Sequence, residues 1–181
     1  MKKLILFIFL LFINVGVYAQ SIGGNVLGVS FRSSIVETFN LLNYKGYSPK
    51  MVPLPAGHSI HYMIEVQCPP NYILSWEECV IDSYVDNFWG RTNIWDVQFM
   101  KLYKDKSIAD TDYAKLLASL KPLYSSLKAG DVFLDISILK HYTVEDKKTK
   151  LIVTEQYNSF NDSYVVNLRF SDKKRYYKEK R

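Results

Sequence analysis

The longest segment with a clean helical period, residues 111–127, sets the main constraint on the fold. It reads TDYAKLLASLKPLYSSL, and its apolar side chains recur at steps of three and four residues: Tyr113, Leu116, Leu117, Leu120, Tyr124 and Leu127. This spacing predicts an α-helix with one apolar face, capped by Asp110 or Thr111 and closed by Gly130. Pro122 lacks an amide hydrogen, which predicts a kink or a break two residues earlier. Such a helix needs an apolar surface to pack on.

The segments before and after this helix in the chain have apolar side chains at alternate positions, which predicts a sheet on which the helix can pack. The alternation occurs in residues 60–66, 79–89, 94–103, 132–138, 151–157 and 164–170. A period of two places these side chains on one face of a sheet. In the strand 94–103, Trp95 is expected on the same side as Val97 and Phe99. Residues 25–31, NVLGVSF, predict a further short strand, whereas prolines 49, 53 and 55 predict an extended connection.

A second, shorter helix is predicted for residues 34–45. Ser34 and Glu37 have the capping-box spacing, in which each side chain binds a free amide of the first turn. The apolar stripe consists of Ile35, Val36, Phe39 and Leu42. Gly46 favours the left-handed backbone that ends a helix. We therefore predict an α+β fold, with two helices packed on one face of a largely antiparallel sheet.

The N-terminal segment predicts export. Residues 1–19, MKKLILFIFLLFINVGVYA, combine two lysines, a short apolar run and small residues at the end. The run is too short to span a bilayer, which takes about 20 residues, and the pattern is that of a secretory signal peptide. The product is expected to be soluble, in the periplasm or outside the cell. Residues 20–172 are expected to form one domain, in which helix-plus-three-strand halves, 25–104 and 105–172, indicate a tandem αβββ repeat.

Positive charge is concentrated at the C-terminus. The whole chain has a formal net charge of +5, but residues 173–181, KKRYYKEKR, hold six Lys and Arg against one Glu. Without them and without the two leader lysines the domain is slightly acidic, which argues against nucleic-acid binding. We expect a basic tail that frays into solvent. Two alternatives are an arm for an anionic lipid or polysaccharide and a segment that docks on a partner.

Cys68 and Cys79 are the only cysteines. In an exported chain an even pair predicts a disulfide. It would close the loop CPPNYILSWEEC and contribute about 3 kcal/mol by loop entropy. The spacing excludes a CxxC redox site.

Aromatic residues make up 15% of the chain, an unusually large share. Strand preference assigns many of them to the core. Alternation nevertheless places some on the outer face, where Tyr and Trp favour protein contacts. The candidates for a ligand-binding surface are Tyr72 and Trp76, in the loop between the cysteines, with Trp89 and Trp95.

Motifs for catalysis and cofactor binding are absent from the sequence, which has no GxSxG, no glycine-rich phosphate loop and no HExxH. His58 and His61, three residues apart on a strand, would point to opposite faces, and His141 is expected to be solvated. Asp82 and Asp86 would lie about 13 Å apart on a strand, wider than either glycosidase carboxylate pair. We predict no catalytic residue, no metal and no cofactor.

The run at residues 26–47, VLGVSFRSSIVETFNLLNYKGY, resembles the opening of small exported Gram-negative proteins that begin with a "(V/L)LG(V/I)xFGxS" strand and a helix. The matching residues are Leu27, Gly28, Val29, Phe31 and Ser33, whereas Arg32 stands where that pattern has glycine. The order of elements is similar to that of the β-lactamase inhibitory protein and of outer-membrane assembly lipoproteins of the SmpA/OmlA type, although this chain has no lipidated cysteine. The resemblance implies a non-catalytic, protein-binding role and carries over no functional residue.

The sequence therefore supports three hypotheses about function. The first is an exported, non-enzymatic protein-binding or assembly module. The second is a carbohydrate-binding accessory protein that uses exposed Tyr and Trp. The third, a hydrolase, requires carboxylates or a nucleophile that converge in a cleft.

Overall fold

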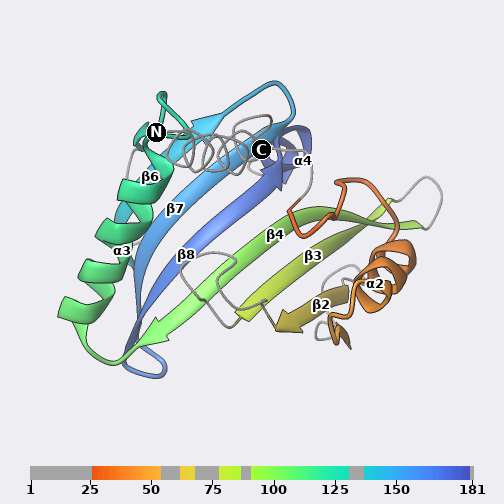
Figure 1. Cartoon of the computed structure of the whole chain (residues 1–181), viewed down its shortest axis with the longest axis horizontal. Helices are drawn as coiled ribbons and strands as arrows, with labels where there is room; N and C mark the ends of the chain where they lie inside the picture. Colours follow the sequence, from red (N-terminus) through yellow and green to blue (C-terminus); the bar gives the residue numbers. More distant parts are fainter. Residues whose placement is uncertain (1–25, 54–61, 68–77, 87–90, 131–136, 180–181) are drawn as a thin grey trace, which may run out of the picture.

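A computed structural model of the chain describes residues 26–53, 62–67, 78–86, 91–130 and 137–179 (Figure 1). They form a mixed α+β fold built on one eight-stranded sheet, in the order β1-β2-β3-β4-β8-β7-β6-β5, with antiparallel neighbours throughout. The strands are β1 (Lys50–Pro53), β2 (Tyr62–Gln67), β3 (Glu78–Asp86), β4 (Arg91–Tyr103), β5 (Lys128–Ala129), β6 (Ile138–Glu145), β7 (Thr149–Asn158) and β8 (Ser163–Asp172). The helices are α2 (Ile35–Tyr44), α3 (Lys106–Leu120) and α4 (Lys173–Glu179). The predicted mixed class is confirmed.

The sheet consists of two four-strand meanders that meet where β4 pairs with β8 (Figure 1). This central pairing runs from Asp96↔Ser171 to Tyr103↔Tyr164. A helix precedes each meander, α2 before β1 and α3 before β5. Each half therefore has four strands instead of the predicted three, because the short edge strands β1 and β5 add to each. β1 replaces part of the extended connection predicted around the prolines.

Helix α2 begins and ends as predicted. Ser34 accepts from the Glu37 amide at 3.2 Å, and the Glu37 side chain accepts from the Ser34 amide at 3.1 Å. At the other end Gly46 has φ +82°. The amides of Gly46 and Tyr47 donate back to carbonyls of the last turn, each at 3.0 Å, which is a Schellman motif.

Helix α3 begins earlier than predicted. The cap was predicted at Asp110 or Thr111, but Asp105 caps the helix by accepting from the Ser107 amide at 2.7 Å. The helix ends at Leu120, two residues before Pro122, so the predicted break is confirmed. The predicted helical continuation to Leu127 is wrong, because the chain turns there and enters β5.

The core lies on the side of the sheet that α2 and α3 cover. One hydrophobic cluster joins side chains of both helices to the apolar side of the strands. Its fully buried members are Leu42, Ile64, Ile81, Ile94, Val97, Phe99, Ala109, Leu116, Leu151, Val153, Val166 and Leu168. Residues two apart in β7 and β8 supply this cluster, so the predicted alternation is confirmed there.

A β-bulge in β4 places Trp95 on the opposite side of the sheet from the one predicted. Ser83 lies opposite Ile94 and Asp82 opposite Asp96, which leaves Trp95 as the extra residue. Trp95 was expected beside Val97 on the core side. It lies instead against Arg169, on the opposite face of the sheet.

The predicted strand at residues 25–31 is also wrong. Val26 and Val29 form only an isolated bridge, because Leu27 and Gly28 have φ values of 56° and 79° and make a tight turn between them. The first part of the predicted strand 132–138 lies outside the described residues, and β6 begins at Ile138. Among the helices of the described ranges, none has the length and apolar character needed to cross a membrane.

Candidate functional site

Most residues that the sequence singled out lie outside the described ranges. These are Tyr72, Trp76 and Trp89 among the predicted ligand-binding residues, and Cys68 of the predicted disulfide. Cys79 lies in β3. The disulfide and the loop between the cysteines therefore stay predictions.

The histidines give no metal site where they are described. His58 and His61 lie outside the described ranges. His141 was expected to be solvated, which is wrong, because it is half-buried in β6 with its ring against Gly130. A Cβ atom at Gly130 would lie 2.6 Å from that ring. In the described part of the chain, no group of three His, Cys, Asp or Glu side chains could hold a metal ion.

Trp95 belongs to a cluster on the outer face of the sheet, the face opposite the core. The guanidinium carbon of Arg169 lies 5.0 Å from the centre of the Trp95 ring and 6.0 Å from that of Tyr176. Its Nε lies 2.5 Å from Oδ2 of the fully buried Asp96. Asp96 also accepts from the Ser171 hydroxyl at 3.2 Å. The two rings and the carboxylate hold the guanidinium in one orientation.

Tyr176 belongs to α4, where the sequence predicted a fraying tail. That prediction is wrong, because residues 173–179 form a helix directly after β8 that contacts β7 and β8. Tyr176 is only 8% exposed. The Arg175 amide donates to Asp172 Oδ1 at 3.1 Å, which holds the first turn of the helix. The basic segment is therefore fixed on the sheet by a buried aromatic side chain.

Lys150 of β7 connects α4 to the edge of the sheet. Its Nζ lies 4.7 Å and 5.0 Å from the ring centres of Tyr176 and Tyr177, and donates to the Tyr177 hydroxyl at 3.2 Å. That hydroxyl donates to Glu145 Oε2 at 2.8 Å, and Lys173 Nζ lies 2.9 Å from Oε1. The Lys173 contact lowers the pKa of Glu145 against the effect of burial, with a smaller contribution from Tyr177. Glu145 is therefore a carboxylate whose charge Lys173 compensates.

A hollow of about 410 Å³ opens beside this cluster. We call it the edge hollow; it is lined by Ser126, Lys128, Thr143, Val144, Glu145, Lys150 and Tyr177. It lies where the short β5 stops: β5 pairs with β6 only at Lys128↔Thr143 and Ala129↔Tyr142, and β6 continues past it. Lys128 is exposed, and its Nζ has no hydrogen bond or ion pair to the residues that the structure describes.

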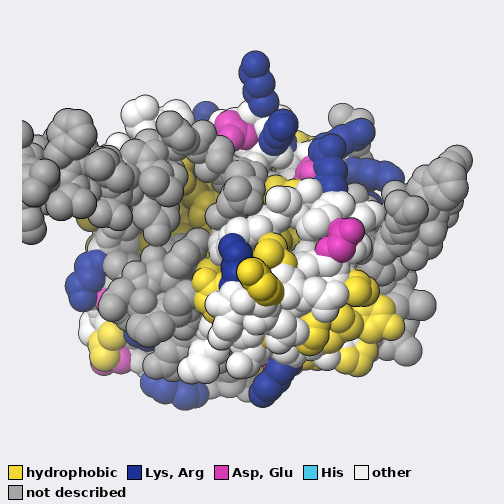
Figure 2. Space-filling model, turned by 45° about the vertical axis from the view of Figure 1, so that its right-hand side comes forward, with side chains coloured by type: hydrophobic (Ala, Val, Ile, Leu, Met, Phe, Trp, Pro, Cys, Tyr) yellow, Lys and Arg dark blue, Asp and Glu magenta, His cyan; other side chains and the backbone are white. Residues whose placement is uncertain are grey.

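The surroundings of the edge hollow are basic. β5, the β6–β7 turn, β7 and α4 carry eight Lys and Arg residues near this region, and the carboxylates beside them in the chain whose side chains the structure describes are fewer: Lys128, Lys147, Lys148, Lys150, Lys173, Lys174, Arg175 and Lys178, against Glu145, Asp146 and Asp172. Figure 2 shows Lys and Arg side chains along the upper side of the molecule, at the height where Figure 1 places α4. Such a surface attracts anions.

Lys128, Lys150 and Arg169 could not be identified from the sequence, because their neighbours come from strands far apart in the chain. The one local signal is that Tyr176 and Tyr177 are the only apolar residues in the sequence of the basic segment 173–181. Two adjacent aromatic side chains among cations could have indicated a docked segment, because aromatic rings bury readily and bind cations.

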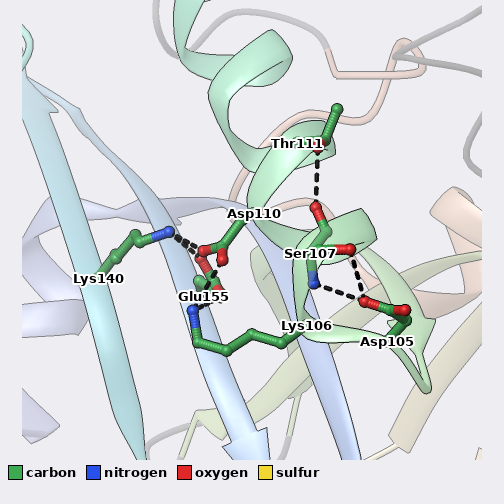
Figure 3. A network of polar contacts seen from close by, with 7 residues as sticks. All are labelled: Asp105, Lys106, Ser107, Asp110, Thr111, Lys140 and Glu155. Atoms are coloured by element: carbon green, nitrogen blue, oxygen red, sulfur yellow. Dashed lines mark hydrogen bonds and ion pairs between the residues drawn. The ribbon is translucent and has the colours of Figure 1, made fainter.

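A second polar cluster joins α3 to the sheet (Figure 3). Glu155 of β7 is fully buried, and the Nζ atoms of Lys140 and Lys106 lie 2.7 Å and 4.0 Å from its oxygens. Asp110 forms ion pairs with both lysines, at 2.8 Å to Lys106. Burial lowers the pKa of Lys140, but its contacts with Asp110 and Glu155 raise the pKa more, so the net shift is upward. These paired charges connect the first turns of α3 to β6 and β7.

This cluster predicts a specific acid sensitivity. Contacts with Lys106 and Lys140 lower the pKa of Asp110 from 3.8 to about 2. The lowered pKa means that ionised Asp110 stabilises the fold above about pH 4, and that this stabilisation is lost as the pH falls towards 2. Asp110→Asn should therefore flatten the dependence of the urea midpoint on pH between 4 and 2. Glu65→Gln, at an exposed position of β2, should leave it unchanged. The same slope in all three proteins would contradict this role.

No protein-family model, no curated protein and no solved structure matches the chain.

Proposed function

We propose that this chain is an exported, non-enzymatic binding module, and that it recognises a protein partner through α4 and the edge hollow. The observation that carries the proposal is the fixed position of the basic C-terminal segment on the sheet. Tyr176 anchors the segment, and Tyr177, which is 41% exposed, remains at the surface. Tyr and Arg side chains held in place in this way are typical of protein interfaces, because little conformational entropy is lost on binding.

Pairing of the charged groups supports binding over catalysis. Glu145, Asp96 and Glu155 each lie within 3 Å of a Lys or Arg nitrogen. A carboxylate that is occupied by a cation is less available to exchange a proton with a substrate. Residues 1–19 support export, and the helix-plus-meander order of both halves supports a tandem duplication.

Carbohydrate binding is the alternative, and the half-exposed Trp95 is the observation that favours it. One side of this ring is occupied by Arg169, 5.0 Å from its centre. Titration with cell-surface glycans should change the tryptophan fluorescence of the wild-type protein more than that of Trp95→Phe if Trp95 binds sugar. An unchanged spectrum favours the protein partner.

Site-specific photocrosslinking tests the proposal. Tyr177 on α4 is replaced by p-benzoylphenylalanine, and Tyr44 on α2, which is 90% exposed, serves as the matched control. In cells that produce the protein, irradiation should give a discrete crosslinked protein band from position 177 and none from position 44. Bands of equal strength at both positions, or none at either, would contradict the proposed surface.

A further inference from the structure

We propose that the edge hollow binds a carboxylate of an extended acidic peptide segment. Lys128 and Lys150 supply the positive charge, and the outer edge of β5 supplies backbone hydrogen bonds. The inference rests on the proposed function, since it names the chemistry of the protein partner at the same surface.

The charges that line the hollow favour an anion. Lys173 compensates Glu145 at 2.9 Å, so the lining has a surplus of positive charge from Lys128 and Lys150. Lys150 donates one hydrogen bond, to Tyr177. An ammonium group has three donors, so Lys150 can also bind a ligand. Lys128 is exposed and has no hydrogen bond or ion pair within the described part of the chain, so a carboxylate that enters the hollow could form charge-assisted hydrogen bonds with it.

The sheet edge favours an extended peptide as the source of that carboxylate. β5 is the last strand in the sheet order, and within the described ranges no strand pairs with its outer edge. An extended peptide can add to such an edge through its backbone. Its side chains then alternate, so every second one points to the same side. One acidic side chain of the peptide would reach the hollow beside Lys128.

A polymer of uronic acids carries the same carboxylate chemistry but fits the hollow less well. Among the described residues that line the hollow, Tyr177 is the one aromatic side chain. Lys150 lies 5.0 Å from the centre of its ring, and Tyr176 packs against it edge-on at 5.4 Å. Lys150 therefore occupies part of the ring that a sugar would stack on, and a sugar polymer cannot continue the ladder of backbone hydrogen bonds that an extended peptide forms with β5.

Binding of fluorescein-labelled hexaglutamate, measured by fluorescence anisotropy, tests the inference. Wild-type protein should bind the peptide with an affinity that falls as salt is added. Lys128→Gln should weaken binding about tenfold, the effect of losing one charge-assisted hydrogen bond. Lys50→Gln is the matched control: Lys50 is an exposed lysine on β1, the strand at the opposite end of the sheet. It should weaken binding less than about twofold. Thermal unfolding checks that both variants fold.

Three results would overturn the inference. The first is no binding of hexaglutamate, and the second is equal weakening by both variants, which would indicate diffuse attraction. The third is binding of polygalacturonate, but not of hexaglutamate, that depends on Lys128. Crosslinking from position 177 without hexaglutamate binding would refute the acidic-peptide inference and leave the proposed function intact. Loss of crosslinking would refute the proposed function itself.

Discussion

Phe99→Ala is expected to lower the free energy of unfolding by about 4 kcal/mol, the range found when a buried aromatic side chain is removed. Phe99 is fully buried in β4, opposite Leu168 of β8, at the junction of the two meanders. Its ring packs edge-on against Phe170 with the centres 6.4 Å apart. The substitution leaves a cavity where the two halves of the sheet meet. Urea unfolding measures the change.

Leu102→Ala is the control for this prediction. Leu102 lies three residues further along β4 and is 47% exposed. Its truncation removes side-chain atoms that already contact water, so we expect a loss below about 1 kcal/mol. If Phe99→Ala and Leu102→Ala destabilise the protein equally, the assignment of the two faces of β4 is wrong.

Lys140→Met is expected to cost about 2 kcal/mol, because it removes the compensating cation from a fully buried carboxylate while Lys140 itself is partly exposed to solvent. Lys140 is the cation nearest to the fully buried Glu155, at 2.7 Å. After the substitution the closest remaining cation is that of Lys106, 4.0 Å from the carboxylate. The negative charge of Glu155 would then be buried without a cation in direct contact to neutralise it. The contact of α3 with β6 would also weaken. Thermal or urea unfolding at pH 7 measures the loss.

A second variant separates this mechanism from lost packing. Lys140→Met with Glu155→Gln removes the uncompensated charge, so the double variant should be more stable than Lys140→Met alone. Lys115→Met is the surface control, because Lys115 pairs with Asp112 at 3.2 Å while 62% exposed. Its expected cost is below about 0.5 kcal/mol. A double variant less stable than Lys140→Met would contradict the mechanism.

Local signals predicted the parts of the fold that depend on neighbours in sequence. The capping box of Ser34 and Glu37 predicted the start of α2. The apolar alternation of residues 164–170 predicted which face of β8 packs on the core. Pro122 gave the end of α3. Each of these features acts within a few residues, and the structure has all of them.

The remaining features depend on contacts between distant segments. The bulge at Trp95 is set by the register of β3 on β4, and β5 is too short to show a period of its own. The start of α3 was misplaced because Asp105 and Asp110 are both acceptable caps, and the ion pairs of Asp110 with Lys106 and Lys140 favour the longer helix.

The surface proposed for binding is the part of the molecule that the sequence predicted least well. From charge alone, residues 173–181 were predicted to be a solvated tail, whereas the burial of Tyr176 between Lys150 and Arg169 and the ion pair of Lys173 with Glu145 hold α4 on the sheet. Tyr72, Trp76 and Trp89 remain candidates in parts of the chain that the structure does not describe.

Hydrogen–deuterium exchange of the protein, with and without hexaglutamate, tests most directly whether α4 is a docked helix that completes the proposed binding surface. The account predicts that amides of residues 173–179 exchange more slowly than in an unstructured peptide. The ligand should slow them further, together with those of residues 126–129 and 143–145, and leave β1 unchanged. Exchange of residues 173–179 at the rate of a free peptide, or equal slowing in β1, would contradict the account.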